Sequence, residues 1–170
     1  MRFLLIVRHC EARPASGSER DWDRPLTDRG REQAAQIREW MTEEALTRGY
    51  LPARVLVSSA RRTRETFALT FEAAGVVEES VVSNLIYNGG RDVSGEDILA
   101  DLGALDDVRT NLAVVAHNPS VSELVYGLVG GWPEGLSEGL PVGAVIVLEL
   151  DDTRPVGLSP YRWIESFLPV

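Results

Sequence analysis

The sequence contains no lysine, so all 17 of its positive charges are arginines. Acidic residues outnumber them, and the net charge of −9, with an isoelectric point of about 4.7, argues against binding to nucleic acid or to an anionic membrane surface. Small partners, or neutral to basic ones, fit this charge better. Arginine is well suited to forked contacts with phosphate or carboxylate. For most of the 17 arginines, a compositional bias is the better explanation.

Cysteine is also scarce, since Cys10 is the only one. A single cysteine can form neither an internal disulfide nor a cysteine-based zinc site, which suits a reducing compartment. The opening residues MRFLLIV hold an apolar run too short for a signal-peptide core, and no run elsewhere approaches the length that spans a membrane. We therefore expect a cytoplasmic protein with no membrane partner.

Short apolar runs in the sequence indicate buried strands. These runs are Phe3–Val7, Val55–Val57 and Leu112–Ala116, with Val81–Val82 as a weaker candidate. Two more strand-like segments, Val142–Asp151 and Tyr161–Leu168, are joined by a turn-rich linker. Such a pair favours an antiparallel edge on the sheet.

Helical patterns lie between the predicted strands. Apolar residues recur at helical spacing in Asp28–Thr47, and Thr27 is a plausible N-cap. Two further segments can form helices, Ala60–Ala74 and Gly95–Leu105. After the last parallel strand, Asn118 is a good N-cap and Pro119 a good first helical residue, which predicts another helix there.

The order of these elements predicts the fold class. Strands that alternate with helices, followed by an antiparallel edge, predict an α/β fold of three layers, αβα, in which helices cover both faces of a mostly parallel sheet. No repeat, low-complexity tract or linker interrupts the chain, so we expect residues 1–170 to form a single domain.

The only two histidines both follow predicted strands. His9 comes after Phe3–Val7 and Arg8, and His117 directly follows Leu112–Ala116. In an open parallel sheet, ligands bind at the carboxyl ends of the strands, so the two imidazoles can meet at one site. Either ring could instead be a structural histidine bonded to a backbone carbonyl. The lack of any other histidine, and the arginine directly before His9, favour a functional pair.

A cluster of arginines follows another predicted strand, Val55–Val57. Arg61, Arg62 and Arg64 lie in the first turns of the expected helix. A cation at that end costs about 0.3–1 kcal/mol against the helix dipole. A bound anion would remove the conflict, because the free N–H groups and the arginines would both point at it. A solvated basic face is the alternative, and it accounts best for two of the three arginines.

Four segments stand in a set order along the chain: VRHCEA, RPLTDRGREQA, VLVSSARRTRET and VVAHNP. Together they resemble the histidine phosphatase superfamily, also called phosphoglycerate mutase-like, and within it the small bacterial phosphohistidine phosphatases. The first is similar to the family's Arg-His-Gly signature and the last to its second-histidine strand. The order and spacing hold from Leu4 to about Leu128, and four linked segments are far more specific than one.

The resemblance implies a phosphatase with named roles for four residues. His9 would be the nucleophile that becomes phosphorylated, while Arg8, Arg62 and His117 would hold the phosphoryl oxygens. Arg62 is assigned because it falls four positions after Ser58, where the family places its arginine. Nearby cations keep the nucleophilic imidazole neutral. We expect no metal and no cofactor, because phosphoryl transfer needs little beyond a nucleophile and fixed positive charge.

Three positions depart from the family's pattern. Cys10 replaces the signature glycine, Ser59 a proline and Glu65 a glutamine. If the glycine is needed for a positive φ, Cys10 would be strained there. Ser59 and Glu65 can change how the side chain of Arg62 is positioned.

A general acid is not obvious in the sequence. Many phosphomonoesterases of this family supply one from the loop after the third strand, but here no acid directly follows Leu85. Asp92, Glu96 and Glu11 remain as candidates, and each is also explained as a surface or helix-entry carboxylate. A missing acid favours a substrate whose leaving group is already good, such as phosphohistidine. The expected partner is therefore a phosphorylated protein or a small phosphate substrate, and a phosphohistidine protein is favoured.

Other functions remain open from the sequence alone. A small-molecule phosphomonoesterase would be favoured if Asp92 or Glu96 reached the pocket. A non-catalytic module that binds phosphate or a phosphoprotein is made plausible by Cys10 and by the missing acid. Nucleotide binding is not expected, because the chain has no P-loop lysine and no G-x-G-x-x-G after a strand.

Overall fold

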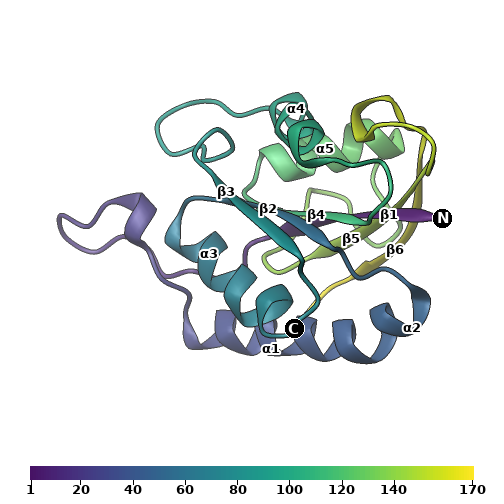
Figure 1. The fold of residues 1–170 in the computed structure, drawn as a ribbon. Helices are drawn as coiled ribbons and strands as arrows, with labels where there is room; N and C mark the ends of the chain where they lie inside the picture. The colour runs from purple at the N-terminus through teal and green to yellow at the C-terminus, as the bar shows by residue number, and fades with distance from the viewer.

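A computed structural model describes residues 1–170, whose strands form one six-stranded sheet (Figure 1). The strand order is β3-β2-β4-β1-β5-β6. The bounds are β1 (Arg2–Arg8), β2 (Arg54–Ser58), β3 (Glu79–Ser83), β4 (Leu112–Ala116), β5 (Val145–Leu150) and β6 (Tyr161–Phe167). The first four strands run parallel, whereas β5 is antiparallel to β1 and β6 is antiparallel to β5. The predicted antiparallel edge is confirmed.

Helices cover both faces of this sheet, as the three-layer prediction requires (Figure 1). Their bounds are α1 (Asp28–Trp40), α2 (Leu46–Arg48), α3 (Arg61–Phe67), α4 (Gly95–Leu105) and α5 (Ser120–Val129). The first three lie on one face, and α4 and α5 lie on the other. π-helical turns at Met41–Ala45 and Ala68–Glu72 extend α1 and α3. None of the helices combines the length and apolar character needed to cross a membrane.

Two apolar cores flank the sheet, because successive residues of a strand point to opposite faces. In β1, Leu4 and Ile6 belong to the core beneath α4 and α5. Leu5 and Val7 belong to the core beneath α1. All four side chains are fully buried. The continuous apolar run of β1 is thus explained by burial on both faces, and it holds the strand's carboxyl end rigidly.

The edge strand β3 differs from the other parallel strands. The predicted strand at Val81–Val82 is confirmed, but the expected burial is wrong, because these side chains are 39% and 56% exposed. β3 pairs only with β2, and its outer edge is open to solvent.

The start of α1 is pressed against the loop that follows β1. Thr27 caps the helix as predicted, since its Oγ1 accepts a hydrogen bond from the Gly30 N–H at 3.0 Å. A Cβ on Gly30 would lie 2.1 Å from the carbonyl oxygen of Glu11. Only glycine permits this approach. The contact fixes the backbone two residues beyond His9.

The start of α5 differs from the predicted cap at Asn118. Asn118 is not the N-cap, because its Oδ1 accepts from Ser122 Oγ at 2.5 Å and its Nδ2 donates to the Leu140 carbonyl at 3.0 Å. The helix begins at Ser120, one residue after Pro119. The Asn118 side chain therefore ties the loop at Leu140 to the segment behind His117. This tertiary contact replaces the local cap.

Candidate active site

The carboxyl ends of β1 and β4 bring the two histidines together. The strands pair in parallel with Arg8 opposite Ala116, so each next residue is a histidine at the same sheet edge. The His9 N–H donates to the Ala116 carbonyl at 3.1 Å, and the His9 and His117 ring centroids are 5.4 Å apart. Both side chains are buried. The two residues expected to meet therefore lie side by side.

The His9 ring is held in one orientation by its own neighbour. Nδ1 lies 2.7 Å from the carbonyl oxygen of Cys10. A carbonyl only accepts, so Nδ1 carries the proton and the neutral ring keeps its lone pair on Nε2. Burial lowers the pKa of His9 to about 3 against the opposing Cys10 hydrogen bond, and the charges of Arg62, Arg8 and Arg24 lower it further.

Of the three arginines at the start of α3, only Arg62 is buried, at 4% exposure. Arg61 is exposed and pairs with Glu65, with Nε and Oε1 2.7 Å apart. Arg64 is also exposed, and its guanidinium carbon lies 4.7 Å from the Trp22 ring centroid. The solvated-face explanation thus fits Arg61 and Arg64, whereas Arg62 points inward.

Three buried nitrogen atoms among these residues have no hydrogen-bond partner. They are Nε of Arg8, Nε of Arg62 and Nδ1 of His117. Burial, followed by the charge of Arg62, lowers the pKa of His117 to about 2, so this ring is neutral. A buried donor without an acceptor is costly, and native structures rarely leave one unexplained. Several such donors around His9 are typical of a site that accepts an anion.

Other polar atoms of Arg8 and His117 are anchored by hydrogen bonds. Arg8 Nη1 donates to the Leu140 carbonyl at 2.7 Å. His117 Nε2 lies 2.6 Å from Ser58 Oγ. When that hydroxyl donates to Nε2, the ring proton is on Nδ1, which makes the unpartnered atom a donor.

Comparison with known proteins identifies the family of this chain. The sequence model of the histidine phosphatase superfamily (branch 1) matches residues 4–85, a span that includes His9 and Arg62. An uncharacterised chloroplastic protein of Arabidopsis thaliana is 35% identical over 168 residues, which are 98% of this chain and 71% of that protein. The chain belongs to the histidine phosphatase superfamily.

Solved structures share the fold of this histidine phosphatase. A protein named as the phosphohistidine phosphatase SixA from Agrobacterium tumefaciens matches with a TM-score of 0.79 and 24% identity over 99% of both chains. One from Nakamurella multipartitia, named likewise, gives 0.76 and 26% over 99% and 96%. The protein histidine phosphatase SixA complexed with tungstate gives 0.72 and 23% over 95% and 94%. Superfamily membership implies phosphatase activity.

Cys10, in place of the signature glycine, is not strained in this histidine phosphatase. Val108 is the only non-glycine residue with a positive φ, so Cys10 does not need the glycine conformation. Its N–H donates to Thr66 Oγ1 at 3.0 Å. Burial raises the pKa of the thiol to about 12, although interaction of the thiol with the Thr66 side chain opposes this. The thiol is therefore neutral and packs in the core.

The other two departures connect α3 to the segment before α1. Ser59 Oγ accepts from Trp22 Nε1 at 3.1 Å. Glu65 Oε2 accepts from the Leu26 N–H at 2.8 Å, while its Oε1 pairs with Arg61. Both side chains therefore help to hold the loop between β1 and α1 against the start of α3.

Asp21 lies at this site and was not among the predicted residues. It begins a short 3₁₀ turn in the long excursion between β1 and α1 (Figure 1). Its Oδ2 accepts from Arg62 Nη2 at 3.1 Å and from the Tyr87 hydroxyl at 2.8 Å, and its Oδ1 accepts from Arg24 Nε at 2.9 Å. Burial opposes ionisation, but these partners hold the pKa of Asp21 at about 2.

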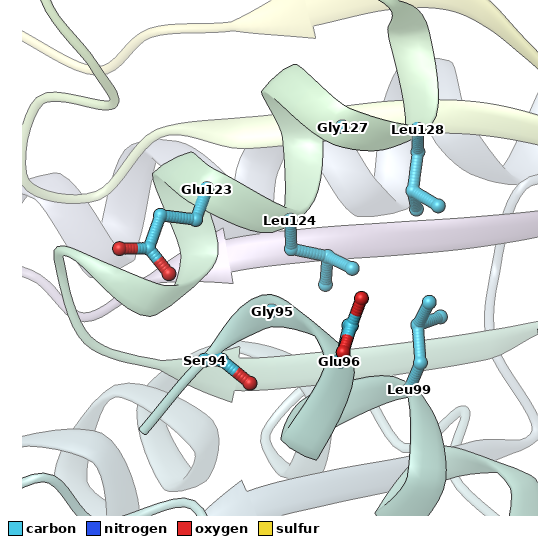
Figure 2. Close-up of a pocket in the computed structure, with 8 residues that line it drawn as sticks. All are labelled: Ser94, Gly95, Glu96, Leu99, Glu123, Leu124, Gly127 and Leu128. Atoms are coloured by element: carbon cyan, nitrogen blue, oxygen red, sulfur yellow. The ribbon is translucent and has the colours of Figure 1, made fainter. Parts of the chain in front are cut away.

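The three predicted candidates for a general acid lie elsewhere. The Glu11 carboxylate accepts from Thr27 Oγ1 at 2.9 Å and pairs with Arg29 at 3.0 Å. Glu96 lines a hollow of about 410 Å³ between α4 and α5 (Figure 2), and Asp92 lines two neighbouring hollows. Neither histidine lines any of these three hollows. No three His, Cys, Asp or Glu side chains lie close enough together to hold a metal ion.

The lowered pKa of His9 predicts the pH dependence of the reaction. Because the pKa falls from 6.5 to about 3, the free enzyme keeps a neutral His9 at every pH above about 3. We expect kcat/KM, corrected for ionisation of the substrate, to show no loss as the pH falls from about 8 to about 5. Steady-state assays with an aryl phosphate measure this profile. A loss of kcat/KM below about pH 6.5 that remains after the correction for substrate ionisation would contradict it.

Proposed function

We propose that the protein is a phosphatase that works through a phosphohistidine intermediate on His9, and that its substrate is a phosphohistidine of another protein. One observation carries the proposal. Buried nitrogens of Arg8, Arg62 and His117 lack partners beside a histidine with a free lone pair. The three equatorial oxygens of a phosphoryl group in transfer are acceptors of the right charge for such donors.

His9 is the attacking group in this proposal. Its Nε2 forms a bond to phosphorus while the bond from phosphorus to the leaving group breaks, and the electron pair of that bond departs with the leaving group. Arg8, Arg62 and His117 hold the phosphoryl oxygens throughout. Water then attacks phosphorus, which releases phosphate and returns the lone pair to Nε2. Fixed arginine charge stabilises the transferring group, so we infer an enzyme without metal or cofactor.

The leaving group narrows the class of substrate. An alkoxide leaves slowly unless an acid protonates it. Glu11 is tied to the start of α1, while Asp92 and Glu96 line hollows on the α4 side. Asp21 lies near the histidines, but its carboxyl has a pKa of about 2. It is therefore ionised at neutral pH and has no proton to donate to the leaving group. These placements support a substrate with an intrinsically good leaving group.

A phosphoramidate meets this requirement, and protein phosphohistidine is the example the comparisons favour. Solved proteins of the same fold are named as phosphohistidine phosphatases, one of them at 26% identity and a TM-score of 0.76. A phosphorylated protein is therefore the partner that we propose, ahead of a small phosphomonoester.

A substrate panel tests the choice of leaving group. We expect phosphohistidine protein and aryl phosphates to be turned over much faster than alkyl phosphates such as phosphoglycerates and sugar phosphates. Asp92→Asn and Glu96→Gln should leave the rates on good substrates nearly unchanged, since neither carboxyl moves a proton in the reaction. Steady-state kinetics on the panel measure both effects.

Two results would replace this proposal with an alternative. If an alkyl phosphate were turned over as fast as phosphohistidine, and one amide variant lost the roughly 100-fold or more expected of a general acid, the protein would be a phosphomonoesterase. If phosphate bound tightly but no substrate was turned over and no phosphoenzyme formed, the protein would be a binding module.

A further inference from the structure

A further hollow lies beside the histidines, on the side of the loop between β1 and α1. It has a volume of about 440 Å³ and is lined by Arg20, Asp21, Trp22, Asn84 and Tyr87. Its walls come from that loop and from the segment after β3, which are remote from each other in the chain. None of the family's motif residues lines it, so the roles assigned so far leave this hollow unexplained.

Two contacts connect this hollow to the phosphoryl site. Asp21 accepts from Arg62 through both its backbone oxygen and its Oδ2, at 3.0 and 3.1 Å. The Tyr87 ring meets the His117 ring edge to face, with centroids 5.8 Å apart. The hollow is therefore the space next to the place where phosphorus would be attacked.

The Arg62 guanidinium lies between the two regions. Its Nη1 and Nη2 bind Asp21, while its Nε is buried and has no partner. A phosphoryl oxygen on Nε would then share one rigid, planar cation with the Asp21 carboxylate. The group attached to phosphorus would lie within reach of Asp21 and the walls of the hollow.

We propose that this hollow is the subsite for the departing imidazole of a phosphohistidine, and that the Asp21 carboxylate accepts the imidazole N–H. The inference rests on the proposed function and adds a specificity-determining residue to it. A carboxylate has about four lone-pair sites. Three are taken by Arg62, Tyr87 and Arg24, so one stays available for a further donor.

The chemistry favours a cationic ring at this position. When the substrate's imidazole is protonated on the nitrogen remote from phosphorus, His9 attack breaks the P–N bond and its electron pair returns to the nitrogen that leaves. The ring departs as neutral imidazole and keeps its one proton, so no acid is consumed. A negative charge at the N–H favours the imidazolium form, and aromatic walls such as Tyr87 also attract a cation.

The same carboxylate disfavours an anionic leaving group. A phenolate that develops negative charge next to Asp21 is repelled, and an imidazole is not. The hollow is also rigid, because Trp22 is fixed by its hydrogen bond to Ser59 and by the guanidinium of Arg64. This rigidity strengthens the discrimination between a phenolate and an imidazole leaving group. Selection between phosphoramidates and aryl esters is therefore expected to depend on the charge at position 21.

The test compares Asp21→Asn with wild type on two probes, phosphoimidazole and 4-nitrophenyl phosphate. A hydrogen bond to a charged group is lost, so kcat/KM for phosphoimidazole should fall by about ten- to hundredfold. The rate with 4-nitrophenyl phosphate should not fall and is expected to rise. Glu19→Gln is the matched control, because Glu19 is on the same loop but pairs with Arg13 and neither residue lines the hollow, so it should leave both rates unchanged.

The ratio of the two rates decides the outcome. Equal loss on both probes would show that Asp21 only positions Arg62, and no loss on either would show that the hollow does not hold the leaving group. Either result overturns the subsite. Failure of the proposed function is distinct, since the wild-type protein would then form no phosphoenzyme on His9 with either probe. The pH profile adds a check, because the Asp21→Asn effect should grow as phosphoimidazole becomes protonated.

Discussion

Replacing His9 with alanine should abolish both turnover and formation of the phosphoenzyme. In the proposed mechanism, the His9 imidazole is the only group that bonds to phosphorus, and the carbonyl of Cys10 holds it with its Nε2 lone pair free. No other side chain can replace it, because the neighbouring His117 is engaged by Ser58 through its own Nε2. In another hydrolase, loss of the nucleophile lowers kcat on the order of a millionfold, and we expect a loss of that kind here.

The variant should still bind phosphate, which separates loss of chemistry from loss of the site. Arg8, Arg62 and His117 remain in place, and removal of a buried ring whose pKa is lowered by burial takes no salt bridge from the fold. Phosphate binding by calorimetry and thermal unfolding serve as controls. Acid-labile labelling that persists in His9→Ala would show that another residue is the nucleophile.

Replacing Arg62 with alanine should reduce kcat/KM far more than the same change at Arg61. Loss of a preorganised donor to the transition state costs about 2.7–4 kcal/mol, or roughly 100- to 1,000-fold. Arg62 is 4% exposed, has an unpartnered Nε, and its charge lowers the pKa of both histidines. Arg61 is exposed and pairs with Glu65 on the surface of α3, where such pairs contribute little.

Steady-state kinetics of the two variants on a good substrate measure this contrast. Arg62→Lys is a useful third variant, because a lysine keeps the charge but cannot bind Asp21 with two nitrogens while it offers a third to phosphate. We expect it to be intermediate. If Arg61→Ala lost as much as Arg62→Ala, or more, the alignment of the arginine four positions after Ser58 would be wrong by one residue.

Much of the fold follows from local sequence patterns. Leu112–Ala116 was predicted with the bounds that the structure shows, because a short apolar run buried on both faces leaves little ambiguity. Gly95–Leu105 was also predicted correctly, and Ser94 supplies a capping box for it. Asn118 was misassigned because its side chain bonds to Leu140, a residue 22 positions away. Local rules for caps cannot anticipate such a distant partner.

The residues of the candidate site also fall into those that the sequence predicted and those that depend on distant contacts. His9 and His117 could be placed together because parallel strands end at one edge. Arg62 could be assigned only through the family resemblance, which places an arginine four positions after Ser58, and the structure buries this side chain. Asp21 and Tyr87 could not be predicted, because they lie in loops whose paths depend on long-range contacts. In the sequence, DWDR is only one more charged surface segment. The residues that we propose to select the leaving group are therefore the ones that sequence patterns left out.

A rapid-quench experiment on the wild-type protein tests directly whether His9 carries the phosphoryl group during turnover. The enzyme is mixed with a phosphohistidine protein labelled on phosphorus, quenched at alkaline pH within one turnover, digested and mapped by mass spectrometry. If His9 is the nucleophile, one acid-labile, alkali-stable phosphoryl group is found on the peptide that contains His9, formed and lost at rates that match turnover. Label on any other residue, or turnover without a phosphoenzyme, would contradict it.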